Sequence, residues 1–251
     1  AERLLCRAFI VEERVLTFPV FPNKKSQVSG RNYSRISNGF QTFHVFQSFM
    51  SDNNRNGFVI GVTGGIACGK SEVGQILKSM GYSVLDADGL AHELMCNGSP
   101  IHQRILEEFG EGVLLETGEI SRPVLGEIVF GDREKRARLN ELVHPAVRKE
   151  FKKWIAAMRQ EGRSAAGLVP LLFESGMQNL DWDRVVCVSC PEPLVVRRLE
   201  GRGLDLAEAK QRIHSQMPLA EKEKLSDHVV RNEGTLRELE LAVRKTVGAL
   251  N

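Results

Sequence analysis

The hydrophobic pattern of this chain is clearest from residue 58 onward. Residues 58–63 (FVIGVT) form a short apolar run rich in β-branched side chains, which predicts a fully buried strand of a parallel sheet. In residues 72–80 the apolar side chains lie three, one and three positions apart, which predicts one buried face of a helix. A strand, a glycine-rich turn and a helix are therefore expected in this order.

The same pattern repeats along the rest of the chain. Further buried strands are predicted at residues 83–86, 166–173, 184–189 and 228–232. Helices are predicted at residues 89–95, 101–109, 121–130, 133–143, 146–161, 192–202, 205–217, 219–225 and 235–250, with a hairpin-like turn at 116–119. This order predicts an α/β fold in which a five-stranded parallel sheet carries helices on both faces. The helices within residues 97–161 are expected to form an inserted region that walls a substrate cleft.

The turn after the first strand, residues 64–71 (GGIACGKS), matches the phosphate-binding pattern G-x-x-x-x-G-K-[ST] at every fixed position. Its glycines let the backbone turn tightly and bring N–H groups up to an anion, and the positive end of the helix adds to that attraction. Lys70 can reach the β- and γ-phosphates, and Ser71 can place its hydroxyl on Mg²⁺. A chance match is the alternative, but the strand before and the helix after favour a nucleoside triphosphate site.

Two carboxylates follow the second strand. Asp86 and Asp88 are expected at the carboxyl end of that strand, the edge at which parallel α/β sheets bind ligands. There they could accept a proton from an attacking hydroxyl and hold Mg²⁺ or its waters. The alternative is that Asp88 caps the following helix. We expect Asp88 one strand over from the phosphate loop, facing the same point in space.

Two basic features each have a structural and a functional interpretation. The helix after Pro191 contains Arg197, Arg198 and Arg202, which could be a solvated face or part of a mobile cap that brings positive charge to a phosphoryl group. Its place after the fourth strand favours the cap. His144 is expected at a junction between two helices, where a structural role is favoured over a catalytic one.

Composition sets broad limits on function. An apolar fraction of 42% and a charged fraction of 26% are those of a globular chain, and a net charge of +2 does not indicate nucleic-acid binding. No apolar run approaches the roughly 18 residues of a membrane-spanning helix. The five cysteines form an odd, scattered set, which favours a reducing compartment over a disulfide framework. A cytoplasmic location is expected on this basis.

Cys187 and Cys190 have the C-x-x-C spacing of a redox pair or of half a zinc site. No second cysteine pair completes a zinc site, and the surrounding residues resemble a buried strand that runs into a turn. A structural role is therefore the favoured interpretation.

Residues 1–50 differ from the rest of the chain. They contain few acidic residues, are basic and rich in serine, and show no sustained helix or strand period. A mitochondrial transit peptide is one interpretation, and non-native coding sequence before Met50 is another. The second is favoured, so little stable structure is expected in residues 1–50 and the functional domain is expected to span residues 51–251.

Several short motifs together resemble dephospho-coenzyme A kinases, over about residues 58–250. They are residues 63–71 (TGGIACGKS), 85–88 (LDAD) with Ala91, 139–145 (LNELVHP), 170–174 (PLLFE), 197–199 (RRL), Arg212 with Ile213, Gln216 and 232–234 (NEG). The first motif alone occurs in many nucleotide-binding proteins, whereas the ordered set is far more specific.

The resemblance implies a P-loop kinase fold and a reaction in which ATP phosphorylates the ribose 3′-hydroxyl of dephospho-coenzyme A. It implies that Asp88 is the base and that Lys70 and Arg198 stabilise phosphoryl charge. The phosphate-binding motif and the end of the second strand make Ser71 and Asp86 the predicted ligands of Mg²⁺. The implied ATP-binding residues are Gly64, Gly65, Ile66, Ala67, Cys68, Gly69, Lys70, Ser71, Glu72 and Asn232. Residues 97–161 would bind the acceptor and residues 203–226 would form a helical lid. The implied partner is dephospho-coenzyme A, with no nucleic acid or membrane.

Three positions depart from the family pattern. Cys68 occupies a loop position usually filled by Ser or Ala, which should be harmless because that position contributes backbone. Residues 167–169 (GLV) lack the acidic residue that often precedes Pro170, which puts a Mg²⁺ contact there in doubt. Ser226 replaces a more usual alanine, which is a small change.

Three rival functions remain open at this stage. Another small-molecule kinase of the same architecture would differ in its acceptor pocket. A GTP-dependent switch is suggested by residues 86–89 (DADG), but these come only fifteen residues after Ser71, and no N-K-x-D element is present. A non-catalytic nucleotide binder is disfavoured because Lys70, Ser71, Asp88 and Arg198 are all intact.

Overall fold

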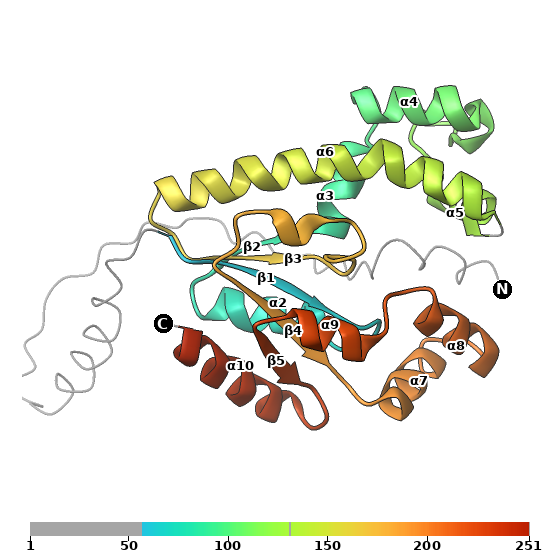
Figure 1. Cartoon of the computed structure of the whole chain (residues 1–251). Helices are drawn as coiled ribbons and strands as arrows, with labels where there is room; N and C mark the ends of the chain where they lie inside the picture. Colours follow the sequence, from blue (N-terminus) through green and yellow to red (C-terminus); the bar gives the residue numbers. More distant parts are fainter. Residues whose placement is uncertain (1–56, 131, 251) are drawn as a thin grey trace, which may run out of the picture. The chain divides into compact units, whose positions relative to one another are not determined.

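The computed structural model describes residues 57–130 and 132–250 (Figure 1). The expectation of little stable structure in residues 1–50 lies outside this range. Within it, five parallel strands form one sheet in the order β2-β3-β1-β4-β5. The strands are β1 (Val59–Gly64), β2 (Ser83–Asp86), β3 (Ala165–Leu168), β4 (Arg184–Ser189) and β5 (His228–Arg231). The predicted fold class is confirmed.

Helices connect these strands and cover both faces of the sheet. They are α2 (Lys70–Ser79), α3 (Ala87–Leu94), α4 (Pro100–Phe109), α5 (Arg122–Phe130), α6 (Arg133–Gln160), α7 (Glu192–Glu200), α8 (Leu206–His214), α9 (Leu219–Leu225) and α10 (Leu236–Leu250). Short 3₁₀ turns lie at Glu111–Val113 and Met177–Asn179. Helix α6 runs along one face of the sheet, and α2 and α10 cover the other (Figure 1).

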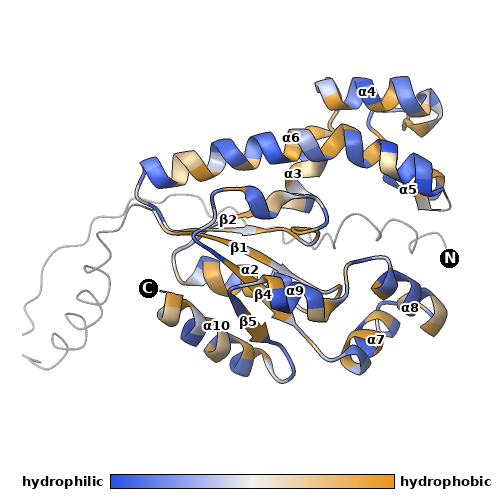
Figure 2. Cartoon of the chain, viewed as in Figure 1, coloured by the Kyte–Doolittle hydropathy of each residue, from blue (hydrophilic) through white to orange (hydrophobic). Residues whose placement is uncertain are grey.

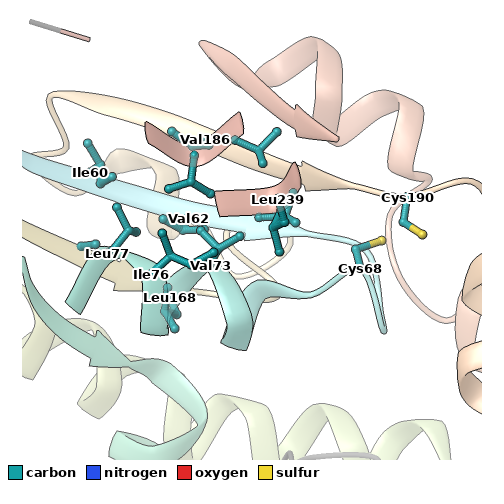
Figure 3. Close-up of a cluster of buried hydrophobic side chains, with 14 of the residues drawn as sticks. Ile60, Val62, Cys68, Val73, Ile76, Leu77, Leu168, Val186, Cys190 and Leu239 are labelled. Atoms are coloured by element: carbon teal, nitrogen blue, oxygen red, sulfur yellow. The ribbon is translucent and has the colours of Figure 1, made fainter. Parts of the chain in front are cut away.

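The side chains of β1 alternate between these two faces, as the period of a strand requires. Ile60 and Val62 pack with side chains of α2 and α10, as Figure 3 shows for Ile76 and Leu77. Val59 packs on the opposite face against α6. Both faces of β1 are therefore buried, and Figure 2 shows the strands of the sheet as mainly hydrophobic. This central strand ends at the phosphate loop and fixes its position in the fold.

Helix α6 corrects the prediction of two helices that meet at His144 and Pro145. The structure has one helix of 28 residues that continues through Pro145. A proline inside a helix removes one backbone hydrogen bond, which usually favours a break. Here Leu142 and Val143 before the proline and Val147 after it are all buried. Packing on both sides of Pro145 therefore keeps the helix continuous.

Several other boundaries differ from the predicted ones, and two of these differences lie close to the candidate site. Strand β3 ends at Leu168, although the apolar run continues to Phe173, because Pro170 has no N–H to donate to a neighbouring strand. Helix α3 begins at Ala87 rather than at residue 89. The second difference changes which aspartate caps the helix, as described below.

Candidate active site

The phosphate loop connects the end of β1 at Gly64 to the first turn of α2 at Lys70. Its backbone requires glycine at two positions. At Gly64 φ is +147° and a Cβ would lie 2.2 Å from the carbonyl oxygen of Val188, and at Gly69 φ is +96° and a Cβ would lie 2.2 Å from Nδ2 of Asn232. The loop is thus shaped by its neighbours as well as by its own sequence.

The Lys70 side chain folds back over this loop. Its Nζ lies 3.2 Å from the carbonyl oxygens of both Gly64 and Gly65 and donates to them. An ammonium group has three donors, so one remains for an anion in the loop. Burial lowers the pKa of Lys70, while the nearby Cys68 and Asp88 act in the opposite direction. The cation is therefore held where the sequence motif predicts phosphate.

Two side chains from the C-terminal part of the chain donate hydrogen bonds to backbone carbonyls in the middle of the phosphate loop. Asn232, which is buried, donates from Nδ2 to the carbonyl oxygen of Cys68 at 2.9 Å. Arg198, on α7, donates from Nη1 to the carbonyl oxygen of Ala67 at 3.0 Å and from Nη2 to that of Asn232 at 3.2 Å. The contacts observed for Arg198 and Asn232 are thus with backbone carbonyls, and their predicted contacts with ATP stay predictions.

Asp86 and Asp88 lie at the carboxyl end of β2, and the structure assigns the capping role to Asp86. Its Oδ1 accepts from the backbone N–H of Asp88 at 3.2 Å, which makes Asp86 the N-cap of α3. The suggestion that Asp88 caps the helix is therefore wrong. Among the residues that the structure describes, no hydrogen bond or ion pair holds the Asp88 carboxylate, which lies in the first turn of α3 and lines a pocket.

The pKa of Asp88 is strongly perturbed. Burial and the neighbouring Asp86 raise it to about 7, against the opposing effect of Lys70. Burial also raises the pKa of Asp86. A carboxyl group with a pKa near neutrality is well matched to accept a proton at physiological pH. Lys70 and Asp88 influence each other's pKa, so the two groups lie within electrostatic reach of each other.

The order of strands corrects the expectation that Asp88 lies one strand away from the phosphate loop. Strand β3 lies between β1 and β2, so the carboxylates are two strands away from the phosphate loop and not one. The backbone that follows β3 fills the interval, and the carbonyl oxygen of Pro170 accepts from Oγ1 of Thr63 at 3.2 Å. Pro170 therefore connects the base of the phosphate loop to the surroundings of Asp88.

The pocket beside Asp88 is mainly apolar. Side chains from α3, α5 and α6 line it, among them Ala91, Leu125 and Val143. His144 also lines it, and burial together with the nearby Arg148 lowers the pKa of His144. A structural role was favoured for His144, and Ala91 and Val143 were noted only as members of family motifs, without being assigned to a pocket. These residues come from three separate helices, so only the folded chain shows that they line the same pocket.

The site offers hard oxygen ligands for Mg²⁺. The exposed Ser71 lies in the first turn of α2, and Asp86 is the last residue of β2. No group of three or more His, Cys, Asp or Glu side chains suited to a metal occurs in the described part of the chain. Mg²⁺ bound with a nucleotide needs only one or two carboxylates beside phosphates and water. The residues present therefore fit a nucleotide-bound Mg²⁺.

Comparison with known proteins identifies the family of this chain. A family model described as dephospho-CoA kinase matches residues 58–238. The chain belongs to the dephospho-CoA kinase family. It is 49% identical over 184 residues to the dephospho-CoA kinase of Bacillus licheniformis, an alignment that covers 72% of this chain and 91% of that protein. Members of this family transfer phosphate from ATP to an alcohol group of dephospho-CoA in the last step of coenzyme A biosynthesis.

Solved structures agree with this assignment. The crystal structure of TT1252 from Thermus thermophilus matches with a TM-score of 0.65 and 35% identity, over 78% of this chain and all (100%) of that one. Dephospho-CoA kinase from Campylobacter jejuni matches with a TM-score of 0.59 and 28% identity, over 76% of this chain and 96% of that one. The kinase predicted from the sequence is confirmed, and membership in this family counts against the GTP-dependent switch. None of the described helices is long and apolar enough to span a bilayer.

Proposed function

We propose that this protein transfers the γ-phosphoryl group of ATP to the ribose 3′-hydroxyl of dephospho-coenzyme A, which yields coenzyme A and ADP. The observation that carries the proposal is the placement of Asp88. Its carboxylate lines the apolar pocket, lies within electrostatic reach of Lys70 and has a pKa raised to about 7. A base between an acceptor pocket and a phosphate loop is what this transfer requires.

Each functional group of the site has a part in the proposed reaction. The acceptor oxygen forms a bond to the γ-phosphorus while the bond from that phosphorus to the β–γ bridging oxygen breaks. The proton of the hydroxyl passes to Asp88, and the backbone amides of residues 64–71 with Lys70 stabilise the charge on ADP. Bound Mg²⁺, held by Ser71 and Asp86, would neutralise part of the phosphate charge. Arg198 would act on the transferring group or through the loop that it fastens.

The remaining parts of the chain would bind and enclose the acceptor. Residues 97–161 contain α5 and α6, which provide much of the pocket wall, so we assign acceptor binding to this region. We assign the lid to the segment 203–226. Closure of a lid over the site would exclude water and limit hydrolysis of ATP.

The decisive experiment is incubation of the full chain with ATP, Mg²⁺ and dephospho-coenzyme A, followed by chromatographic measurement of coenzyme A and ADP. We expect equal amounts of both products and a clear preference for ATP over GTP. Adenosine and shikimate serve as alternative acceptors. Phosphorylation of one of these in place of dephospho-coenzyme A, or release of ADP without coenzyme A, would contradict the proposal.

The hydrogen bond from Asn232 to the phosphate loop leads to a second prediction. Asn232→Ala removes the hydrogen bond to the carbonyl of Cys68, and the loss of one buried hydrogen bond of about 1 kcal/mol corresponds to about a fivefold change in affinity. We expect the KM for ATP to rise by about this factor, with a smaller effect on the KM for dephospho-coenzyme A. Glu233→Gln, at the exposed neighbouring position, is the matched control. A selective change in acceptor KM would show that Asn232 acts elsewhere.

A further inference from the structure

A buried lysine outside the steps described above lies close to the site. Lys222, on α9, is 0% exposed, and its Nζ lies 2.8 Å from Oε1 of Glu174 and 2.9 Å from the carbonyl oxygen of Pro170. Burial of a charge is costly unless the charge is paired and hydrogen-bonded. Both partners of Lys222 belong to the segment that follows β3, so the lysine attaches α9 to that segment.

The carbonyl of Pro170 is a junction between three parts of the site. It accepts from Lys222 on α9 and from Oγ1 of Thr63, the residue just before Gly64 and the phosphate loop. Pro170 itself lines the apolar pocket beside Asp88. A shift of this carbonyl would therefore move the pocket wall relative to the phosphate loop.

Glu174 completes the junction from the other side. Its Oε1 accepts from the backbone N–H of Met217 at 3.0 Å as well as pairing with Lys222. Met217 lies just before α9, so Glu174 fastens the start of that helix. Helix α9 is also held through a hydrogen bond from Ser189 to Glu223, and a Cβ at Gly65 would lie 3.5 Å from Leu219. These contacts make α9 part of the framework around the phosphate loop.

We propose that Lys222 and Glu174 are positioning residues that hold the acceptor pocket wall at Pro170 in register with the phosphate loop. The inference rests on the proposed function. In-line transfer depends on the placement of the acceptor oxygen, and a displacement of about 1 Å can cost about a hundredfold in rate. It also follows that α9 belongs to the fixed framework, so that the moving part of the proposed lid ends before Met217.

The test is a comparison of Lys222→Met and Glu174→Gln with the full wild-type chain. Each substrate is varied in steady-state assays, and ATP binding without acceptor is measured by calorimetry. We expect kcat/KM for dephospho-coenzyme A to fall at least about tenfold, while the Kd for ATP stays within about twofold. Lys224→Met, at an exposed position of the same helix, is the matched control and should leave both quantities unchanged.

Two results would overturn the inference. One is a loss of kcat/KM for dephospho-coenzyme A smaller than about tenfold in either folded variant, and the other is a parallel loss of ATP and acceptor affinity. Glu174→Gln retains a side-chain oxygen that can accept from the N–H of Met217, so we expect this variant to fold. It therefore tests the inference even if Lys222→Met does not fold. Failure of the proposed function is separate, because it would appear as absence of coenzyme A formation by the wild-type chain.

Discussion

Asp88→Asn is expected to lower turnover at least about a hundredfold, which is the scale of one lost acid–base contribution. Asparagine keeps the size of the side chain and the polar character of the pocket, but it cannot accept the proton of the attacking hydroxyl. The phosphate loop is not altered, so the affinity for ATP should stay close to that of wild type. The measurement is kcat with both substrates saturating, together with the Kd for ATP. Near-normal turnover would remove the assignment of Asp88 as the base.

The pH dependence provides an independent measurement of the same prediction. The pKa of Asp88 is raised to about 7, and the ionised carboxylate is the form that accepts a proton. In wild type, kcat/KM should therefore rise as the pH increases through about 7 and level off above it. The residual activity of Asp88→Asn should lack this rise. An unchanged pH profile in the variant would assign the titration to another group.

Stability distinguishes a catalytic loss from a folding defect. Because the pKa of Asp88 is raised in the folded state, the folded protein is destabilised by this group as the pH rises through the range between its ordinary value and about 7. Above pH 7 the carboxylate is charged, partly buried and close to Asp86. Asp88→Asn removes that charge, so at pH 8 its thermal unfolding temperature should equal or exceed that of wild type. A lower unfolding temperature would indicate that Asp88 supports the fold.

The sequence was sufficient for those parts of the fold that depend on local pattern. The buried run that became β1 and the amphipathic run that became α2 enclose the phosphate-binding motif, and the structure has all three in place. Ser99, which precedes the helix predicted at residues 101–109, caps α4 because its Oγ accepts from the backbone N–H of His102 at 2.9 Å. Each of these features is decided by residues within a few positions of one another.

Features that depend on long-range packing were not accessible from the pattern. Strand β3 comes some eighty residues after β2 in the sequence, yet it lies between β2 and β1. This placement put the carboxylates two strands from the phosphate loop. Continuation of α6 through Pro145 likewise depends on apolar contacts on both sides of the proline. A local rule for proline cannot include such contacts.

The residues of the candidate site also differ in this respect, because some were predictable from local sequence and others depend on long-range packing. Lys70, Ser71 and Asp88 were identified because each belongs to a short motif or to the end of a predicted strand. Lys222 lies in the helix predicted at residues 219–225, beside other charged residues, and its full burial depends on partners 48 or more positions earlier in the chain. A charged residue that packing buries gives no signal of its own in the sequence. The burial of Lys222 and its contacts with Glu174 and Pro170 were therefore left unpredicted.

Lys70→Ala is the second large effect that we expect, with a loss of turnover of at least about a hundredfold. The substitution removes the cation that would face the transferring phosphate. It also removes two hydrogen bonds, from Nζ to the carbonyl oxygens of Gly64 and Gly65. The first loss acts mainly on the transition state, whereas the second would loosen the loop and weaken the binding of ATP. The experiment must therefore separate kcat from the Kd for ATP.

Lys70→Arg and Lys78→Ala make that separation possible. Arginine keeps the positive charge but replaces a compact ammonium with a broad planar group, which cannot reproduce the same pair of contacts in a narrow loop. We expect Lys70→Arg to recover ATP affinity more than turnover, because electrostatic attraction survives while the placement of charge at the transferring group does not. Lys78→Ala removes an exposed lysine near the other end of α2 and should behave as wild type. If Lys70→Ala lowered ATP affinity and left kcat at saturating ATP unchanged, Lys70 would be a binding residue that does not act on the transition state.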